Sequence, residues 1–219
     1  MTDLTRIERP PQQASTDVPP LLILLHGYGS HEHDLMGLAD YVDPRYRVIS
    51  IRAPLTLDMG GYAWFNIEFT PVGMSMDTQE GFRSRDRLLD LISDLQASSG
   101  NDGTNTVLLG FSQGGAMAMS LLMEAPQRVA GVAFLSGVWL REFLPEDEEI
   151  LAALRDKPVL QTHGTDDPLL PIKKAHNTRD ILSTLPLDLS YHEYQMGHEI
   201  SAECLRQMCT WLTDRLPPL

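Results

Sequence analysis

The chain has 219 residues, of which 42% are hydrophobic and 21% are charged, an ordinary composition for a single domain spanning residues 1–219. Its 30 acidic side chains outnumber 17 basic ones, and this net charge of −13 argues against nucleic-acid binding and against stable anchoring on an anionic membrane. No apolar run approaches the roughly 20 residues that cross a bilayer, and the first residues lack the apolar core of a signal peptide, so we expect a cytoplasmic protein.

Residues 1–19 are polar and rich in proline, and we expect a surface arm or one extra edge strand there. Short apolar runs then alternate with amphipathic stretches, without an internal repeat. The predicted strands are Leu21–Leu25, Arg47–Ile51, Thr106–Leu109, Gly131–Leu135, Pro158–Gln161 and Asp188–Tyr194. Continuous apolar runs are typical of strands buried on both faces. The alternation predicts an α/β fold, in which helices cover both faces of a mostly parallel sheet and ligands bind beyond the carboxyl ends of the strands.

The first predicted strand runs into His26-Gly27-Tyr28-Gly29. A His-Gly-x-Gly loop at the end of a strand can direct a backbone N–H at a reacting carbonyl oxygen, so we predict that the N–H of Tyr28 is an oxyanion donor. The same region is rich in metal-binding residue types, namely His26, His31, Glu32, His33 and Asp34. Their spacing does not match H-E-x-x-H, and we predict no metal site.

The connection of residues 54–77 is long and carries glycine, methionine and aromatic residues. Structureless loops longer than about 12–15 residues are usually functional or disordered, and this one is too apolar for disorder. We predict a pocket wall or lid, with an ordinary core-packed excursion as the alternative. The predicted pocket residues are Trp64, Phe65, Met74 and Met76. An amphipathic helix over Thr78–Ser98 follows.

The segment Gly110-Phe111-Ser112-Gln113-Gly114 is a G-x-S-x-G pattern between an apolar strand and an apolar helix over Ala116–Ala125. This is the strand–turn–helix context of a nucleophilic serine, and the turn is so tight that side chains at either glycine would collide with nearby backbone. Ser112 is therefore the predicted nucleophile, at a helix N-terminus that favours a developing anion. The N–H of Gln113 is the predicted second oxyanion donor.

A serine hydroxyl needs a base, and in this fold the acid and then the histidine follow the serine along the chain. His176 lies in a helical pattern and His192 in a predicted strand, so both are expected to be structural. His198 follows Gly197 in the loop after the last strand and is the predicted base.

The acid is expected beyond a strand end between Ser112 and His198, where two aspartates follow His163-Gly164. Asp167 precedes a proline, which favours an extended backbone. Asp166 is the rival, and spacing alone leaves both open. Further on, Cys204 and Cys209 lie on one predicted helix with their thiols about 140° apart, which excludes a disulfide between them.

These motifs together resemble the small serine carboxylesterases grouped with acyl-protein thioesterases and lysophospholipases in the α/β-hydrolase superfamily. The matching segments, in family order, are LLHGYG, RAP at Arg52–Pro54, WFNI at Trp64–Ile67, GFSQGG at Gly110–Gly115, HGTDDPLLP at His163–Pro171 and Gly197-His198. The resemblance implies an α/β-hydrolase fold, with Ser112 as nucleophile, Asp167 as acid, His198 as base, and Tyr28 and Gln113 as oxyanion donors. It implies no cofactor. A length of 219 residues leaves little room for a large cap domain.

The expected activity is hydrolysis of small-molecule carboxylic esters of short to medium acyl chains through an acyl-enzyme on Ser112. Acyl-protein or acyl-CoA thioesterase and lysophospholipase activities are alternatives within the class. A ligand-binding sensor on a hydrolase scaffold is the alternative of another class, although no triad residue is missing. The sequence does not decide whether the chain forms a homodimer or whether residues 54–77 move as a lid.

Overall fold

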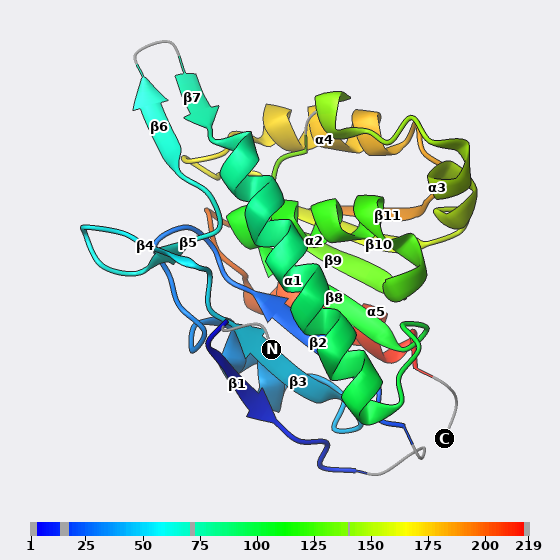
Figure 1. Cartoon of the computed structure of the whole chain (residues 1–219). Coiled ribbons are helices and arrows are strands. Elements are labelled where there is room, and N and C mark those ends of the chain that lie inside the picture. The colour runs from blue at the N-terminus through cyan, green and yellow to red at the C-terminus, as the bar shows by residue number, and fades with distance from the viewer. Residues whose placement is uncertain (1–3, 14–17, 71–72, 140, 217–219) are drawn as a thin grey trace.

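The computed structural model describes residues 4–13, 18–70, 73–139 and 141–216. Within these residues, seven strands form one sheet in the order β1-β3-β2-β8-β9-β10-β11 (Figure 1). They are β1 (Arg6–Arg9), β3 (Arg47–Ile51), β2 (Leu21–Leu25), β8 (Thr106–Phe111), β9 (Gly131–Leu135), β10 (Pro158–Gly164) and β11 (Asp188–Tyr194). Only β1 runs antiparallel, against β3, and the other neighbours are parallel. The predicted mostly parallel sheet is confirmed.

Helices cover both faces of this sheet (Figure 1). They are α1 (Thr78–Ser99), α2 (Gln113–Glu124), α3 (Glu148–Ala153), α4 (Ile172–Leu182) and α5 (Ala202–Thr213), with 3-10 turns at Leu35–Asp40, Pro126–Arg128 and Arg141–Phe143. Every residue of β2 is buried, and alternate ones face opposite layers: Leu21, Ile23 and Leu25 belong to the core under α1, α2 and α4. Leu22 and Leu24 belong to the core under Leu35–Asp40 and α5. The strands are apolar throughout because each has two buried faces.

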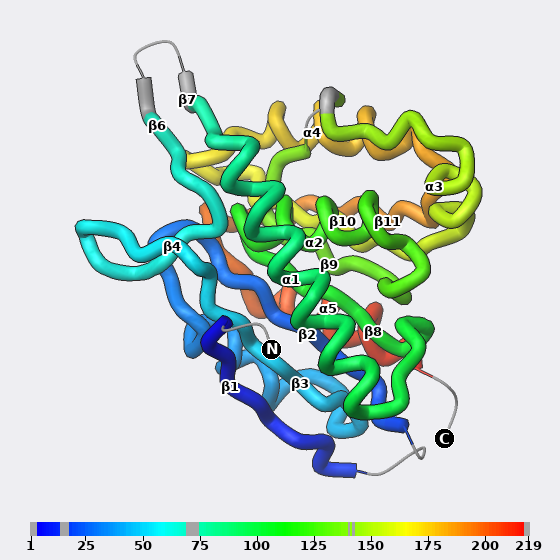
Figure 2. Tube along the Cα trace, viewed as in Figure 1, coloured from blue at the N-terminus to red at the C-terminus, as the bar shows by residue number. Residues whose placement is uncertain are grey.

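The connection between β3 and α1 forms two small hairpins. Strand β4 (Leu55–Thr56) pairs with β5 (Tyr62–Ala63), and β6 (Ile67–Thr70) pairs with β7 (Gly73–Met76). Both hairpins project from the body beside the start of α1 (Figure 2). The sequence predicted a wall or lid here but not its strands, because each is two to four residues long.

Several boundaries differ from the predictions. A surface arm or an edge strand was expected before the first buried strand, and Arg6–Arg9 forms an edge strand paired with β3. Helix α2 begins at Gln113 rather than Ala116, since Gly114 and Gly115 are poor helix formers that tertiary packing tolerates here. Helix α5 begins after Ser201, whose hydroxyl accepts the N–H of Cys204. Cys204 and Cys209 on this helix are both free. Among the described helices, none combines the length and the apolar character needed to cross a membrane.

Candidate active site

The turn between β8 and α2 holds Ser112 in an unusual backbone conformation, with φ 53° and ψ −117°. Positive φ is uncommon for a residue other than glycine and costs about 1–3 kcal/mol. A Cβ on Gly110 would clash with the carbonyl of Gly114, and one on Gly114 would clash with the carbonyl of Leu25. Both glycines of the motif are therefore required by close backbone approach, and the turn presents Ser112 at the N-terminus of α2.

The structure brings Ser112, His198 and Asp167 together from three strand ends, after β8, β11 and β10. His198 Nε2 lies 2.9 Å from Ser112 Oγ, and His198 Nδ1 lies 2.7 Å from Asp167 Oδ2. The imidazole packs on Phe111, with ring centroids 4.9 Å apart. Both distances are those of hydrogen bonds. These linked hydrogen bonds allow the serine to pass its proton to a histidine that a carboxylate orients.

Asp167 is almost fully buried and is held by several donors. Its Oδ1 accepts the N–H groups of Leu169 and Leu170 at 2.9 and 2.8 Å. Burial by itself raises the pKa of the Asp167 carboxyl, but the N–H of Leu170 and the hydrogen bond from His198 outweigh it, and the pKa is lowered overall. The carboxyl is therefore ionised at neutral pH. The rival Asp166 is exposed, and its N–H donates to the carbonyl of Met196.

The other two downstream histidines lie away from this chain of hydrogen bonds. His176 lies on α4, with Nε2 2.7 Å from a carboxylate oxygen of Glu193. His192 lies within β11, where its ring packs near Tyr194.

The two predicted oxyanion donors flank the serine. The N–H of Gln113 belongs to the first residue of α2, where no helical carbonyl precedes it. The N–H of Tyr28 donates to no acceptor within the part of the chain that the structure describes. Its loop lies against the nucleophile, because a Cβ on Gly27 would lie 3.5 Å from the Cβ of Ser112. The Tyr28 side chain is 39% exposed and faces solvent.

The hairpin segment is fixed to the nucleophile turn by the Gln113 side chain. Its amide oxygen accepts the N–H of Trp64 at 2.9 Å, and its amide nitrogen donates to the carbonyl of Phe65 at 2.7 Å. Sequence reasoning assigned only the backbone of Gln113. These partners lie almost fifty positions away, and no local signal identifies them.

Two further sets of polar contacts in the neighbouring loops were not predicted from the sequence: the ion pair of Glu32 with Arg52 and a hydrogen bond of His163. The buried carboxylate of Glu32 forms a bidentate ion pair with Arg52, both N–O distances being 2.6 Å. The guanidinium of Arg52 holds the pKa of Glu32 down at about 2. Buried His163 donates its Nε2–H to the carbonyl of Leu170, 2.7 Å away, in the turn that holds Asp167.

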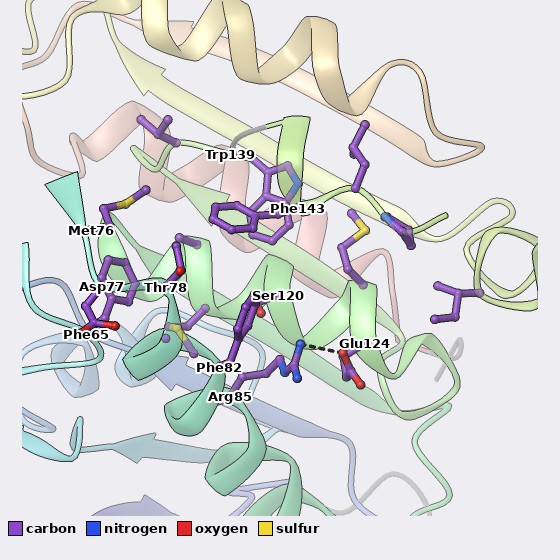
Figure 3. A pocket seen from close by; sticks show the side chains of 18 of the residues that line it. Phe65, Met76, Asp77, Thr78, Phe82, Arg85, Ser120, Glu124, Trp139 and Phe143 are labelled. Carbon is purple, nitrogen blue, oxygen red and sulfur yellow. Dashed lines mark ion pairs between the residues drawn. The ribbon is translucent and has the colours of Figure 1, made fainter. Parts of the chain in front are cut away.

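An apolar groove of about 310 Å³ lies along α2 from Ala116 to Glu124, between α1 and the segments 138–139 and 143–150 (Figure 3), and neither Ser112 nor His198 lines it. Phe65 and Met76, two predicted pocket residues, line one end. Trp64 does not line it: this residue is completely buried, and its indole N–H donates to the carbonyl of His26. The side chain of Met74 lies outside the described residues. The remaining lining side chains are largely apolar and include Phe82, Met117, Met123, Trp139, Phe143 and Leu144.

Charged side chains also line the groove, among them Asp77 beside Phe65, and Arg85 and Glu124 at the other end. Arg85 and Glu124 form an ion pair there at 2.6 Å (Figure 3). Among the described residues, no three His, Cys, Asp or Glu side chains converge as metal ligands.

Comparison with known proteins gives a consistent result. The phospholipase/carboxylesterase family model matches residues 6–215. Acyl-protein thioesterase 1 of Gibberella zeae is 25% identical, with 90% of this chain and 91% of that protein covered. Lysophospholipase-like protein 1 of Mus musculus is 29% identical, with 90% and 87% covered. The crystal structure of esterase PE8 superposes with a TM-score of 0.82 at 25% identity, covering 97% of this chain and 99% of that one.

Proposed function

The chain belongs to the phospholipase/carboxylesterase family and is a serine hydrolase with the α/β-hydrolase fold, and from this premise we propose that it cleaves carboxylic esters of short to medium acyl chains through an acyl-enzyme on Ser112. The observation that carries the proposal is the chain of hydrogen bonds from Ser112 Oγ through His198 to Asp167, at 2.9 and 2.7 Å. Strain at Ser112 and its place at the N-terminus of α2 support it.

The first half of the reaction forms the acyl-enzyme. Ser112 Oγ attacks the acyl carbonyl while its proton passes to His198 Nε2. Asp167 keeps the other ring proton on Nδ1 and stabilises the imidazolium. The N–H groups of Tyr28 and Gln113 donate hydrogen bonds to the negative charge that develops on the carbonyl oxygen, each such donor contributing roughly 3 kcal/mol in the transition state. The acyl-enzyme forms when the tetrahedral intermediate collapses and His198 gives the proton to the leaving oxygen or sulfur, which departs as alcohol or thiol.

The second half of the reaction regenerates the enzyme. Water then attacks the acyl carbonyl, giving its proton to His198, and the carboxylic acid leaves as Ser112 recovers its hydrogen.

The groove along α2 supports an apolar acyl group as the part of the substrate that is selected. The groove begins near Phe65, whose carbonyl accepts a hydrogen bond from the side-chain amide of Gln113, the residue after Ser112. It ends at the ion pair between Arg85 and Glu124. From Ala116 to Glu124 the helix rises about 12 Å, the length of an extended chain of roughly eight to ten carbons. The net charge of −13 favours a neutral or monoanionic ester. Acyl-protein or acyl-CoA thioesterase and lysophospholipase activities remain the alternatives. The names of two relatives, acyl-protein thioesterase 1 and lysophospholipase-like protein 1, support these alternatives.

The experiment is a comparison of wild type with Ser112→Ala on p-nitrophenyl esters from acetate to palmitate, beside palmitoyl-CoA and lysophosphatidylcholine. We expect the variant to lose measurable turnover of every substrate and wild-type kcat/KM to be highest for esters of about four to ten carbons. Persistent ester hydrolysis by the purified variant would exclude Ser112 as nucleophile. A clear preference for palmitoyl-CoA or the lysolipid would replace the ester assignment by one of the alternatives.

A further inference from the structure

His26, at the end of β2, is completely buried and takes no part in the proposed proton transfer. Both of its ring nitrogens have partners: Nδ1 lies 2.8 Å from the carbonyl oxygen of Gly27, and Nε2 lies 3.0 Å from the backbone nitrogen of Ala53. A backbone N–H can only donate, so Nε2 must carry a free electron pair. The ring is then neutral, with its single proton on Nδ1, and this proton is donated to Gly27.

The surroundings favour this neutral form. Burial lowers the pKa of His26 below its usual range, despite the hydrogen bond to Gly27 and nearby acidic groups. The carbonyl of His26 accepts the indole N–H of Trp64 at 2.9 Å, and the two rings pack with centroids 5.5 Å apart. The ring is therefore fixed by Trp64 on one side and by Ala53 on the other.

The carbonyl of Gly27 and the N–H of Tyr28 belong to the same peptide group. In a planar trans peptide these two bonds point in opposite directions, and the described chain has no cis peptide. A donor that holds the carbonyl oxygen of Gly27 on the buried side therefore directs the N–H of Tyr28 to the other side. This peptide borders the reacting centre, because a Cβ on Gly27 would lie 3.5 Å from the Cβ of Ser112 and 3.4 Å from a ring carbon of Phe111.

We propose that His26 is a positioning residue that uses Nδ1–H to hold the Gly27–Tyr28 peptide so that the Tyr28 N–H faces the substrate's developing oxyanion. The inference rests on the proposed function. It assigns to the histidine of the His-Gly dipeptide a task distinct from packing, namely fixing the direction of a hydrogen-bond donor that acts in the transition state.

The substitutions His26→Asn and His26→Gln should each keep one of the two hydrogen bonds of His26 and remove the other. An asparagine amide nitrogen can occupy the place of Nδ1 and keep the donor to Gly27, while it loses the acceptor for Ala53. A glutamine amide oxygen can reach the place of Nε2 and keep the acceptor for Ala53, while it loses the donor to Gly27. We therefore expect His26→Gln to lower kcat on the order of 10²-fold with KM within about twofold, because the lost interaction acts in the transition state. His26→Asn should keep kcat within about fivefold of wild type.

The test measures kcat and KM of both variants on the best nitrophenyl ester, with thermal unfolding as a check on folding. Equal losses of kcat in both variants, or an unchanged kcat in His26→Gln, would overturn the proposal. The tautomer is tested in the wild-type protein itself, which covers the case in which a variant does not fold. A long-range ¹H–¹⁵N spectrum should show His26 neutral and protonated on Nδ1 at pH 7, and protonation on Nε2 contradicts the proposal. Loss of activity in Ser112→Ala together with wild-type kcat in His26→Gln would reject this inference alone and leave the proposed function intact.

Discussion

Ser112 combines a positive φ, a place at the first turn of α2 and a hydrogen bond to a histidine whose other nitrogen faces a buried carboxylate. Each feature alone has a structural explanation, since serine is a common residue at helix N-termini. At Ser112, however, the side chain forms no capping hydrogen bond, and its oxygen is directed at His198 instead. The strain at this residue is therefore not compensated by a cap, which is the pattern expected of a functional position.

At the residue scale, Asp167 provides the sharpest test of how His198 is oriented. Asp167→Asn replaces an acceptor by an amide that can donate to His198 Nδ1, which favours the wrong tautomer for accepting the proton of Ser112. We expect kcat to fall on the order of 10³–10⁴-fold. Steady-state hydrolysis of a nitrophenyl ester measures the effect.

Asp166→Asn is the matched control, because it makes the same chemical change at the exposed neighbour. We expect its kcat to stay within about twofold of wild type, since a substitution away from packed or bonded groups has little effect. Equal losses in the two variants, or a larger one at Asp166, would show that the acid has been assigned to the wrong residue.

At the scale of elements, the loop after β2 and the end of β3 are joined by the ion pair between Glu32 and Arg52. Glu32 is 2% exposed, whereas Arg52 is about a third exposed, so solvent weakens the pair on one side only. We expect Glu32→Gln to lower the free energy of unfolding at pH 7 by about 1–3 kcal/mol, the contribution of hydrogen bonds to a charged group.

The pH dependence of that difference follows from the pKa of Glu32, about 2 when folded against 4.5 as the ordinary value. A lowered folded pKa gives stability that is fully present above the ordinary pKa. The difference between wild type and Glu32→Gln should therefore shrink as the pH falls from about 4.5 towards about 2. Urea unfolding between pH 3 and 7 measures it, with Glu68→Gln on the exposed face of β6 as control. If wild type and Glu32→Gln differ in the free energy of unfolding by the same amount at pH 3 and at pH 7, the ionised carboxylate of Glu32 is not the source of that difference.

The groove along α2 makes a second prediction at this scale. Ser120 lies in the middle of its floor (Figure 3), and Ser120→Phe should fill the space beyond the first few acyl carbons. Each buried methylene contributes about 0.8 kcal/mol, so a variant that no longer buries two methylenes should show a kcat/KM for the octanoate ester roughly 15-fold lower than wild type. The kcat/KM for the acetate ester should stay within about threefold of wild type. The control is Ser183→Phe at the exposed end of α4. A uniform loss across all chain lengths would show that acyl groups do not enter the groove.

At the scale of the whole molecule, the sequence was most informative where local pattern and burial coincide. Leu21–Leu25 and Gly131–Leu135 have the predicted bounds because both faces of these strands are buried and their runs are wholly apolar. Strands β8 and β10 extend to Phe111 and Gly164, beyond the predictions, since Gly110 and Gly164 are weak strand formers that pairing with neighbouring strands holds in the sheet.

Likewise, only part of the candidate site could be predicted from the sequence. Ser112, Asp167 and His198 could be predicted because each follows a strand at the same sheet edge and carries chemistry that few residue types share. The supporting contacts could not, because Trp64 meets His26 and Gln113 only after folding, and an aromatic residue in a long connection gives no sign of facing the core. The pocket assignment of Trp64 was wrong for this reason.

Ser112 is the proposed nucleophile, activated by His198 within a complete oxyanion site. The most direct measurement is labelling of the folded protein with a fluorophosphonate, followed by proteolysis and mass mapping of the modified residue. We predict one label per chain on Ser112, and none in Ser112→Ala or in protein unfolded before the probe is added. No labelling of the folded chain, or labelling at another residue, would contradict the account and favour a ligand-binding protein on a hydrolase scaffold.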